Sequence, residues 1–262
     1  MIRESIGVDG VAELVIANPP VNALGLEDIR QLVSRLRGYT SDARVHAVII
    51  RGEGPGFCGG GDVKEVQRLP GHDGILGQVH GSLDLTLAIS ECPIPVIGAI
   101  HGYCIGLGVL VAGVCDILLA APGTTFVLAE ADNGATSGAI QAIGLLPDKR
   151  LRAAMFTCEP FYSEELASYG SVLRLVPQED LAAAARTLAG TIAAKRNNVI
   201  RGLKAAISNS IGRDLRTAYR QEISYTLELN MSGEARDARG TFVDGTRSGY
   251  LAGGRDPQSP SS

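Results

Sequence analysis

The first half of the chain alternates between short apolar runs and stretches in which apolar residues recur every three or four positions. The runs Ile2–Val8, Val11–Ala17 and Val45–Arg51 predict strands. An Asp-Gly pair between the first two runs is typical of a hairpin turn. Helical spacing of apolar residues predicts helices over Leu26–Leu36 and Ile75–Ile89. This order predicts an α/β fold in which crossover helices join parallel strands.

The same alternation of strand-like and helical patterns continues to about residue 120, and helical patterns predominate after about Gly138. Pro95–Ile100 and Asp116–Ala120 are expected to be strands on either side of a buried helix over Leu107–Gly113. Beyond Gly138, Val172–Val176 is strand-like and the other segments are helical. The helical segments are Leu151–Thr157, Glu164–Tyr169, Leu181–Lys195, Asn198–Ser208 and Asp214–Met231.

The most hydrophobic stretch, Val96–Cys115, is long enough to span a membrane, since His101 is its only strongly polar residue. It also contains five glycines, follows Pro93 and Pro95, and is followed directly by Asp116. No Lys or Arg lies within fifteen residues of either end, where the charges that orient a membrane segment would lie. We therefore expect a buried strand, a glycine-rich turn and a buried helix, and no membrane partner.

Composition excludes several classes of function. The 262 residues carry a net charge of −4 and no run of Lys or Arg, so a nucleic-acid partner is not expected. The five cysteines form no Cys-x-x-Cys pair, which disfavours zinc and disulfide frameworks and fits a reducing compartment. No secretory signal is apparent at the N-terminus, so a cytoplasmic protein is expected. The Gly-, Pro- and Ser-rich end, Gly253–Ser262, is expected to be disordered.

Two glycine-rich turns each precede a predicted helix. The first, Gly54–Gly59, matches Gly-x-Gly-x-x-Gly, but its helix begins near Asp62, too late for the helix start to hold a dinucleotide pyrophosphate. The second is Gly102–Gly108. Each turn can expose a backbone N–H near a helix start, and two such groups directed at one atom form an oxyanion hole. Close packing and positive φ angles are the simpler explanation of the glycines, so the turns alone leave both interpretations open.

Four segments carry a pattern that is more specific than either turn: PPVNAL at 19–24, FCGGGDVKEV at 57–66, the stretch from Pro93 to Asp116 and the stretch from Phe126 to Gly138. Together they resemble the enoyl-CoA hydratase/isomerase, or crotonase, superfamily over about residues 10–250. The resemblance implies a crotonase-like spiral of ββα turns over residues 1–195 and a helical trimerisation region over 196–252. It also implies a homotrimer or hexamer that acts on an acyl-CoA thioester, with coenzyme A as part of the substrate and no permanently bound cofactor.

The resemblance also implies which residues would bind the thioester. The backbone N–H groups of Gly61 and Leu107 would form the oxyanion hole, which matches the position of the two glycine-rich turns. Ala23, in the early Asn-Ala-Leu turn, and Lys64 would contact coenzyme A. A solvated lysine in the first turn of a helix is an equally simple interpretation of Lys64.

The acid–base residues would decide the reaction. Hydratases of the family use two glutamates; in this chain Leu110 occupies the first position and Glu130 the second. A single glutamate at the second position is similar to the family's Δ3,Δ2-enoyl-CoA isomerases. The apolar residues around Glu130 favour a raised pKa, which suits proton transfer, and a surface loop is the alternative. Asp132 is a further candidate, as a second acid–base group, a residue that orients water, or a helix cap.

Segments in the C-terminal third favour one branch of the family. YGSVLRLVPQEDL at 169–181, IAAKRNNVIRGLKAA at 192–206 and AYRQEISYTLELNMSG at 218–233 are similar to bacterial hydrolases that open the last rings in steroid degradation. This branch implies hydrolytic C–C cleavage of a cyclic β-keto acyl-CoA, with isomerase or hydratase activity as the alternative. A non-catalytic acyl-CoA-binding protein and a nucleotide-dependent oxidoreductase are the alternatives from other functional classes.

Overall fold

A six-stranded sheet forms the centre of the fold. The structure, a computed structural model, describes residues 1–233, 235, 239 and 244; the tail expected to be disordered, residues 253–262, lies outside the described residues. The strand order is β1–β2–β3–β4–β6–β9, and every neighbouring pair except the β1–β2 hairpin is parallel, as the sequence pattern predicts. The strands are β1 (Ile2–Ile6), β2 (Val11–Ile16), β3 (Ala47–Gly52), β4 (Val96–Ile100), β6 (Ile117–Ala120) and β9 (Arg174–Leu175).

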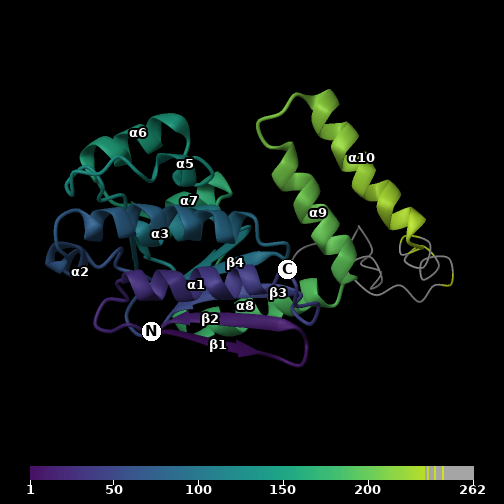
Figure 1. Cartoon of the computed structure of the whole chain (residues 1–262), viewed down its shortest axis with the longest axis horizontal. Helices are drawn as coiled ribbons and strands as arrows, with labels where there is room; N and C mark the ends of the chain where they lie inside the picture. Colours follow the sequence, from purple (N-terminus) through teal and green to yellow (C-terminus); the bar gives the residue numbers. More distant parts are fainter. Residues whose placement is uncertain (234, 236–238, 240–243, 245–262) are drawn as a thin grey trace, which may run out of the picture. The chain divides into compact units, whose positions relative to one another are not determined.

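Helices cover both faces of this sheet. In Figure 1, α1 and α3 lie side by side over one face, and α8 packs against the other face. The helices are α1 (Leu26–Gly38), α2 (Val63–Arg68), α3 (Asp73–Ser90), α4 (Leu107–Val114), α5 (Ala139–Ala142), α6 (Asp148–Thr157), α7 (Ser163–Tyr169), α8 (Gln178–Ala193), α9 (Asn197–Ser210) and α10 (Leu215–Met231).

Alternate residues of the central strands belong to two separate apolar cores. Leu14 and Ile50 belong to the larger core, which includes residues of α1 and α3. Val11 and Ile49 belong to the smaller core, which α8 completes. Because both faces are covered, these strands appear in the sequence as continuous apolar runs rather than as an alternating pattern.

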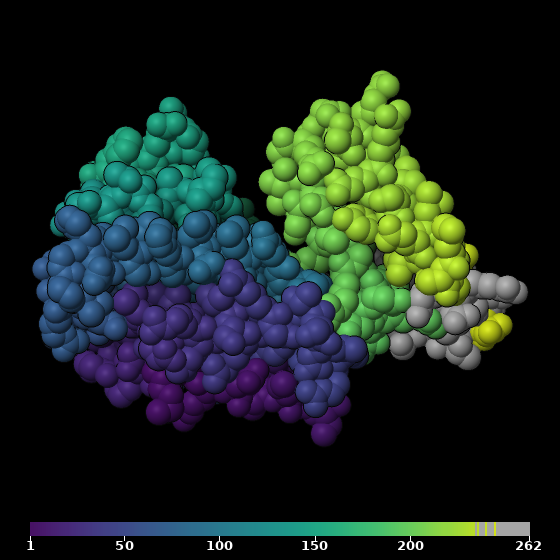
Figure 2. All heavy atoms as spheres, viewed as in Figure 1, coloured from purple at the N-terminus to yellow at the C-terminus, as the bar shows by residue number. Residues whose placement is uncertain are grey.

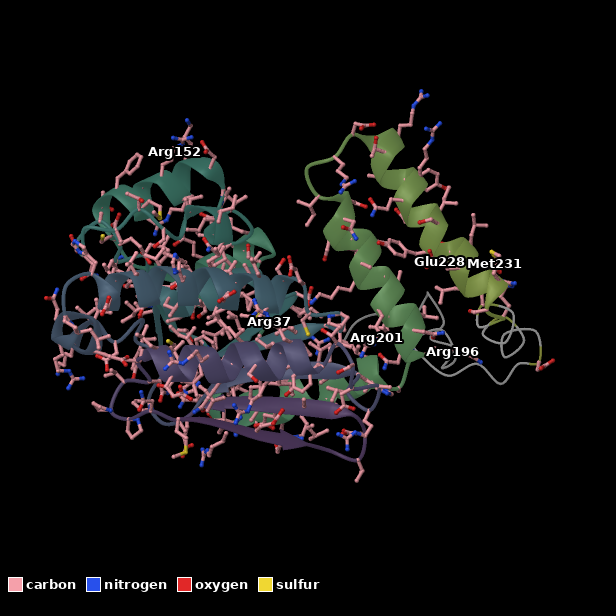
Figure 3. All side chains as sticks on the ribbon, in the orientation of Figure 1. Arg37, Arg152, Arg196, Arg201, Glu228 and Met231 are labelled. Carbon is pink, nitrogen blue, oxygen red and sulfur yellow. The ribbon has the colours of Figure 1, made fainter. Side chains whose placement is uncertain are left out.

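The contact between α1 and α3 fixes where α3 lies. A glycine permits close packing, since a methyl group on Gly81 would lie 3.1 Å from Ile29 Cγ2. At the end of α1, Arg37 pairs with Asp84 of α3, with 2.7 Å between Nη2 and Oδ1; Arg37 is labelled in Figure 3. The position of α3 matters for the candidate site, because one of its side chains lies against Gly61, just after the first glycine-rich turn.

A second, smaller sheet was not predicted from the sequence. Its strand order is β5–β7–β8. The strands are β5 (Tyr103–Ile105), β7 (Thr125–Val127) and β8 (Phe161–Tyr162). Strands of this length are too short to show a periodic pattern in the sequence. The rings of Phe126 in β7 and Phe161 in β8 stack with their centroids 5.5 Å apart, and such a contact between distant residues leaves no local pattern either. The short helix α5 was also not expected, for the same reason.

The chain divides into two compact units, residues 1–201 and residues 202–262. In the described part of the second unit, the end of α9 contacts α10, where Asn209 Nδ2 donates a hydrogen bond to Tyr225 Oη over 2.9 Å. Several large apolar side chains of this unit are exposed, including Leu203, Ile207, Ile211, Leu215 and Leu227. No helix within the described ranges combines the length and the hydrophobicity that a membrane span requires.

Candidate active site

The two glycine-rich turns lie side by side. Cys58 and Cys104 form a parallel β-bridge, and the Ile105 N–H donates a hydrogen bond to the Cys58 carbonyl oxygen over 2.9 Å. Gly108, in the first turn of α4, permits this approach, because a methyl group there would lie 2.8 Å from the same carbonyl oxygen. The approach brings Gly61, just after the first turn, and Leu107, within the second turn, into one region.

Gly61 and Leu107 each have a backbone N–H that donates no hydrogen bond to any described residue. The next amide along the chain, that of Asp62, donates to the Leu24 carbonyl over 2.9 Å. Leu107 is the first residue of α4, and the first amides of a helix have no acceptor within the helix. The segments that carry the two groups adjoin, since a methyl group on Gly60, the residue before Gly61, would lie 4.0 Å from the Leu107 nitrogen. Two neighbouring donors therefore face no acceptor among the residues that the structure describes.

Glu130 is a buried carboxylate beside the second of these donors. It is 7% exposed, and its Oε2 atom has no hydrogen-bond partner in the described part of the chain. A methyl group on Gly106, the residue before Leu107, would lie 3.6 Å from Glu130 Oε1. Burial raises the pKa of the Glu130 carboxyl above its ordinary value of 4.5. A raised pKa suits a group that must both accept and release a proton.

Leu110, which the family resemblance places at the first glutamate of the hydratases, lies close to Glu130. A methyl group on Gly138 would lie 3.2 Å from Leu110 Cδ1 and 3.5 Å from Glu130 Cδ, so both side chains border Gly138. Leu110 is buried in α4. The structure therefore places an apolar side chain next to Glu130, at the position that the family resemblance assigns to the other glutamate of the hydratases.

Asp132 has different surroundings from Glu130, although it lies only two residues further along the same loop. Its side chain is exposed and makes no hydrogen bond or ion pair with another described residue. The next helix, α5, has Gly138 as its N-cap, so Asp132 does not cap it. A role for Asp132 in proton transfer, or in orienting a water molecule, stays a prediction.

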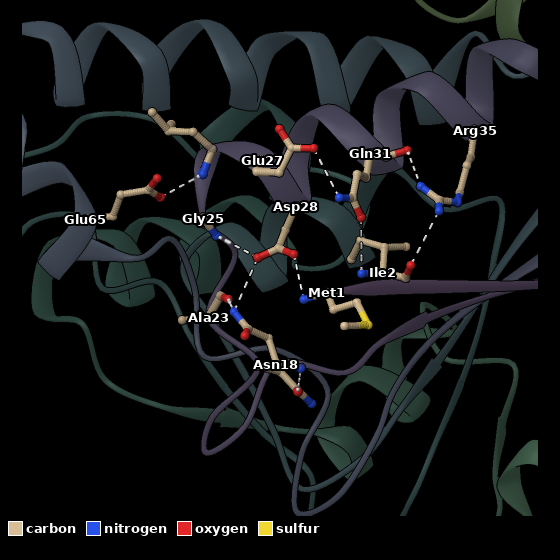
Figure 4. Close-up of polar contacts among 12 residues, drawn as sticks. Met1, Ile2, Asn18, Ala23, Gly25, Glu27, Asp28, Gln31, Arg35 and Glu65 are labelled. Atoms are coloured by element: carbon tan, nitrogen blue, oxygen red, sulfur yellow. Dashed lines mark hydrogen bonds and ion pairs between the residues drawn. The ribbon is translucent and has the colours of Figure 1, made fainter.

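Ala23 and Lys64, the predicted contacts to coenzyme A, lie on two segments that hydrogen bonds connect. Asn18 Nδ2 donates to the Ala23 carbonyl over 2.6 Å, and Glu65 of α2 accepts a hydrogen bond from the Leu26 N–H over 2.8 Å (Figure 4). The exposed Lys64 side chain forms no ion pair with another described residue. The structure thus fixes the turn that carries Ala23 and leaves the Lys64 ammonium available to an anionic ligand.

Gln78 of α3 belongs to this region but was not predicted from the sequence. A methyl group on Gly61 would lie 2.6 Å from Gln78 Nε2, so the carboxamide lies against the backbone of the first predicted donor. In the sequence Gln78 is one of several polar residues in this helix, and such residues are usually solvated. Its location depends on how α3 packs, which the local sequence does not show.

His101, Cys58 and His80 are further ionisable side chains on the segments that form this region. His101 Nε2 lies 2.9 Å from the Gly54 carbonyl oxygen and so connects the two turns. Burial raises the pKa of the Cys58 thiol to about 12, so this thiol is not an activated nucleophile. His80 is exposed on α3. Among the residues described, no three His, Cys, Asp or Glu side chains form a group that could hold a metal ion.

We expect Gly102→Ala to destabilise the junction between the two turns. Gly102 has a φ of +64°, and a methyl group there would lie 1.9 Å from the Pro55 carbonyl oxygen, which belongs to the backbone. Gly54→Ala is the matched control, because Gly54 has a φ of +77° and its methyl group would meet nothing within 4 Å. In urea denaturation, Gly102→Ala should lower the free energy of unfolding by about 2–3 kcal/mol more than Gly54→Ala. Equal losses would contradict this close approach.

Two known enzymes of the same name are similar to this chain over most of its length. A (7aS)-7a-methyl-1,5-dioxo-2,3,5,6,7,7a-hexahydro-1H-indene-carboxyl-CoA hydrolase from Rhodococcus jostii RHA1 is 34% identical over 236 residues, which are 90% of this chain and 92% of that protein. The enzyme of this name from Mycobacterium tuberculosis is also 34% identical, over 89% of this chain and 95% of its own length.

The fold and the family are consistent with the resemblance seen in the sequence. The crystal structure of an enoyl-CoA hydratase from Mycobacterium smegmatis superposes with a TM-score of 0.88 at 23% identity, and covers 95% of this chain and 98% of that one. This similarity confirms the predicted crotonase fold. The sequence model of the enoyl-CoA hydratase/isomerase family matches residues 7–247. The chain therefore belongs to the enoyl-CoA hydratase/isomerase family.

Proposed function

We propose that Gly61 and Leu107 bind the thioester oxygen of an acyl-CoA substrate and that Glu130 transfers protons. The observation that carries this proposal is the pair of backbone N–H groups without acceptors, beside a buried carboxylate oxygen without a partner, among the described residues. Buried polar groups in proteins are rarely left unpaired. A thioester oxygen would supply the acceptor, and a water molecule or an acidic C–H bond of the substrate would supply the partner for Glu130. Ala23 and Lys64 would then contact the coenzyme A part.

The two donors would stabilise the enolate more than the thioester from which it forms. Negative charge develops on the thioester oxygen only as the enolate forms, so hydrogen bonds to that oxygen strengthen in the transition state. One such donor contributes about 3–4 kcal/mol. The bridge between Cys58 and Cys104 lies three residues before each proposed donor, so it would limit how far the donors move and how much energy is lost to reorganisation when the charge appears.

The reaction we propose is hydrolytic cleavage of a C–C bond in a cyclic β-keto acyl-CoA, as in lipid or steroid catabolism. Both hydrolases that are 34% identical to this chain carry names that specify a dioxo bicyclic acyl-CoA. Glu130 would take a proton from water, whose oxygen adds to the β-keto carbon. The bond from that carbon to the α-carbon then breaks, and its electron pair forms the thioester enolate. Glu130 returns the proton to the α-carbon, so the ring opens to a carboxylic acid that still carries coenzyme A.

Isomerisation of a Δ3-enoyl-CoA to a Δ2-enoyl-CoA is the second candidate. Leu110 favours it over simple hydration, because the carboxylate that the hydratases have at this position is absent. Glu130 would remove a proton from C2 and return it to C4, and the same two donors would stabilise the enolate between the two steps. Water takes no part in this reaction, which separates the two candidates experimentally.

Mass spectrometry of acyl-CoA products formed in ¹⁸O-labelled water tests the proposed reaction. The panel contains 2-oxocyclohexane-carboxyl-CoA, 3-pentenoyl-CoA and crotonyl-CoA, each incubated with the purified full chain. We expect a ring-opened acid with one ¹⁸O atom from the first thioester and little product from the others. A heat-inactivated sample controls for uncatalysed hydrolysis.

Other products would indicate other activities of the chain. An unlabelled isomer from 3-pentenoyl-CoA, without ring opening, would make the chain an isomerase. A labelled 3-hydroxyacyl-CoA from crotonyl-CoA would make it a hydratase despite Leu110. No product from any thioester, together with thermal stabilisation by all three, would favour a non-catalytic acyl-CoA-binding protein.

Association of the chain with copies of itself forms part of the same proposal. The family resemblance implies a trimer or a hexamer, built through helices at the C-terminal end of the chain. The exposed apolar side chains of α9 and α10 support this, since contact with a second copy would remove them from water.

A further inference from the structure

Gln78 of α3 presents an unsatisfied carboxamide to the first predicted donor. A methyl group on Gly61 would lie 2.6 Å from Gln78 Nε2 and 3.0 Å from Gln78 Oε1. The Oε1 atom is buried and has no hydrogen-bond partner among the described residues, and Nε2 makes one long hydrogen bond of 3.4 Å to Ser82 Oγ. The carboxamide can therefore still donate and accept a hydrogen bond, at a point in contact with Gly61.

Four outward positions of α3 near Gln78 are apolar, and His80 beside them is also exposed. The four apolar side chains are 48–56% exposed, and Figure 2 shows α3 as part of the blue band at the surface. The residues are Ile75, Leu76, Val79 and Leu83. An acyl group whose thioester oxygen accepts from the Gly61 N–H would extend from a point beside the Gln78 carboxamide. The apolar side chains suit its hydrocarbon part, whereas the carboxamide suits a polar atom on it.

We propose that Gln78 is a specificity-determining residue whose carboxamide hydrogen-bonds to an oxygen of the acyl group close to the thioester, such as a β-keto oxygen. This inference rests on the proposed function, because it requires the thioester at Gly61. Gln78 then selects oxygenated acyl groups, and it does so without taking part in proton transfer. The carboxamide bears no charge, so it can pair with a ketone or a hydroxyl group without the desolvation cost of an ion.

The selectivity follows from the unpaired carboxamide. An acyl group without an oxygen at this point would cover Gln78 and leave its polar atoms unpaired, which weakens binding. Sites built to pair with a substrate oxygen discriminate strongly against analogues that lack it. Acetoacetyl-CoA and butyryl-CoA are a matched pair of probes, since they have the same carbon chain and differ by the β-keto oxygen.

Isothermal titration of the intact chain with both thioesters tests the inference. Wild type should bind acetoacetyl-CoA at least about tenfold more tightly than butyryl-CoA. Gln78→Met keeps the length of the side chain and removes its hydrogen-bonding atoms, so the ratio of the two Kd values should fall below about threefold. The ratio is measured on one protein sample, so a partly unfolded variant changes both titrations equally and leaves the ratio interpretable.

Gln141→Met is the matched control. Gln141 of α5 also has a buried Oε1 without a partner among the described residues, and its Nε2 donates to Thr86 Oγ1 over 3.3 Å. Thr86 lies eight positions beyond Gln78 on α3, or about 12 Å along the helix. Gln141→Met should therefore keep the wild-type ratio of Kd values.

Three outcomes would overturn the inference. An unchanged ratio in Gln78→Met, with both thioesters still bound, would reject the role of Gln78 and leave the proposed function intact. An equal fall in the ratio for Gln141→Met would show a general loss of packing rather than recognition by Gln78. Failure of wild type to bind either thioester would reject the proposed function, and the role of Gln78 with it.

Discussion

Glu130→Gln should lower kcat by about 10²–10⁴-fold on whichever thioester gives product in labelled water, while acyl-CoA binding persists. Glutamine has nearly the same shape as glutamate but cannot take a proton from water or return it to carbon. The substitution also replaces a buried carboxylate, whose Oε2 has no partner among the described residues, with a neutral group. We therefore expect the variant to melt at the same temperature as wild type or higher, as measured by circular dichroism.

The pH dependence of the free energy of unfolding should also differ between wild type and Glu130→Gln. Burial raises the pKa of Glu130 above 4.5, so the folded chain keeps this proton to a higher pH than the unfolded chain. The free energy of unfolding should therefore fall as pH rises from about 4.5 through the folded-state pKa, and Glu130→Gln should lose this part of the decline. In wild type, kcat/KM should rise over the same range, because the carboxylate must be ionised to accept a proton.

An exposed glutamate provides the control. Glu27→Gln, on the outer surface of α1, removes a carboxylate that contacts Arg30 and Gln31 and lies outside the candidate site. Its kcat should stay within about twofold of wild type, since surface substitutions change little. A Glu130→Gln variant with wild-type kcat would show that another group transfers the proton, and Asp132 would be the next residue to test.

Leu107→Pro should lower kcat by about 10²–10³-fold, because it removes one of the two proposed donors to the thioester oxygen. Proline lacks a backbone N–H but is well tolerated at the first position of a helix, which is the position of Leu107 in α4. This N–H donates to no described residue, so its removal costs no hydrogen bond within that part of the chain. Steady-state kinetics on the folded fraction measures the effect.

Leu107→Ala distinguishes the effect of losing the backbone N–H from the effect of losing the leucine side chain. Leu107 is 6% exposed, so both substitutions lose buried side-chain packing and should destabilise the chain by about 2–4 kcal/mol. Only the proline variant loses the N–H. An alanine variant as slow as the proline variant would assign the effect to packing and remove Leu107 from the proposed oxyanion hole.

The larger elements could be predicted because they depend on local sequence. The apolar residues of α1 recur every three or four positions, so its buried face was evident before the fold was known. The parallel strands β3 and β4 lie between covering helices and therefore appear as uninterrupted apolar runs. The strands of the small sheet have no such pattern, because backbone pairing between distant segments creates them.

Burial was harder to predict than residue type. Glu130 and Asp132 lie two positions apart in one loop, and the residues around them make both candidates for proton transfer without showing which side chain is buried. In the structure Glu130 is buried, with its carboxylate close to Gly106 and Gly138, whereas Asp132 is exposed. The difference arises from packing against segments before and after the loop, which a local pattern of residues does not contain.

The fold class, the family resemblance and the residue types at the predicted site follow from the amino-acid sequence alone, including Leu110 where the resemblance implies a glutamate in the hydratases. Which groups lack partners becomes visible only in the folded chain: among the described residues these are the N–H groups of Gly61 and Leu107, Oε2 of Glu130 and Oε1 of Gln78. The physical reason is that a motif records which polar groups a chain carries. Whether each group is paired or buried depends on what the rest of the chain places within hydrogen-bonding distance.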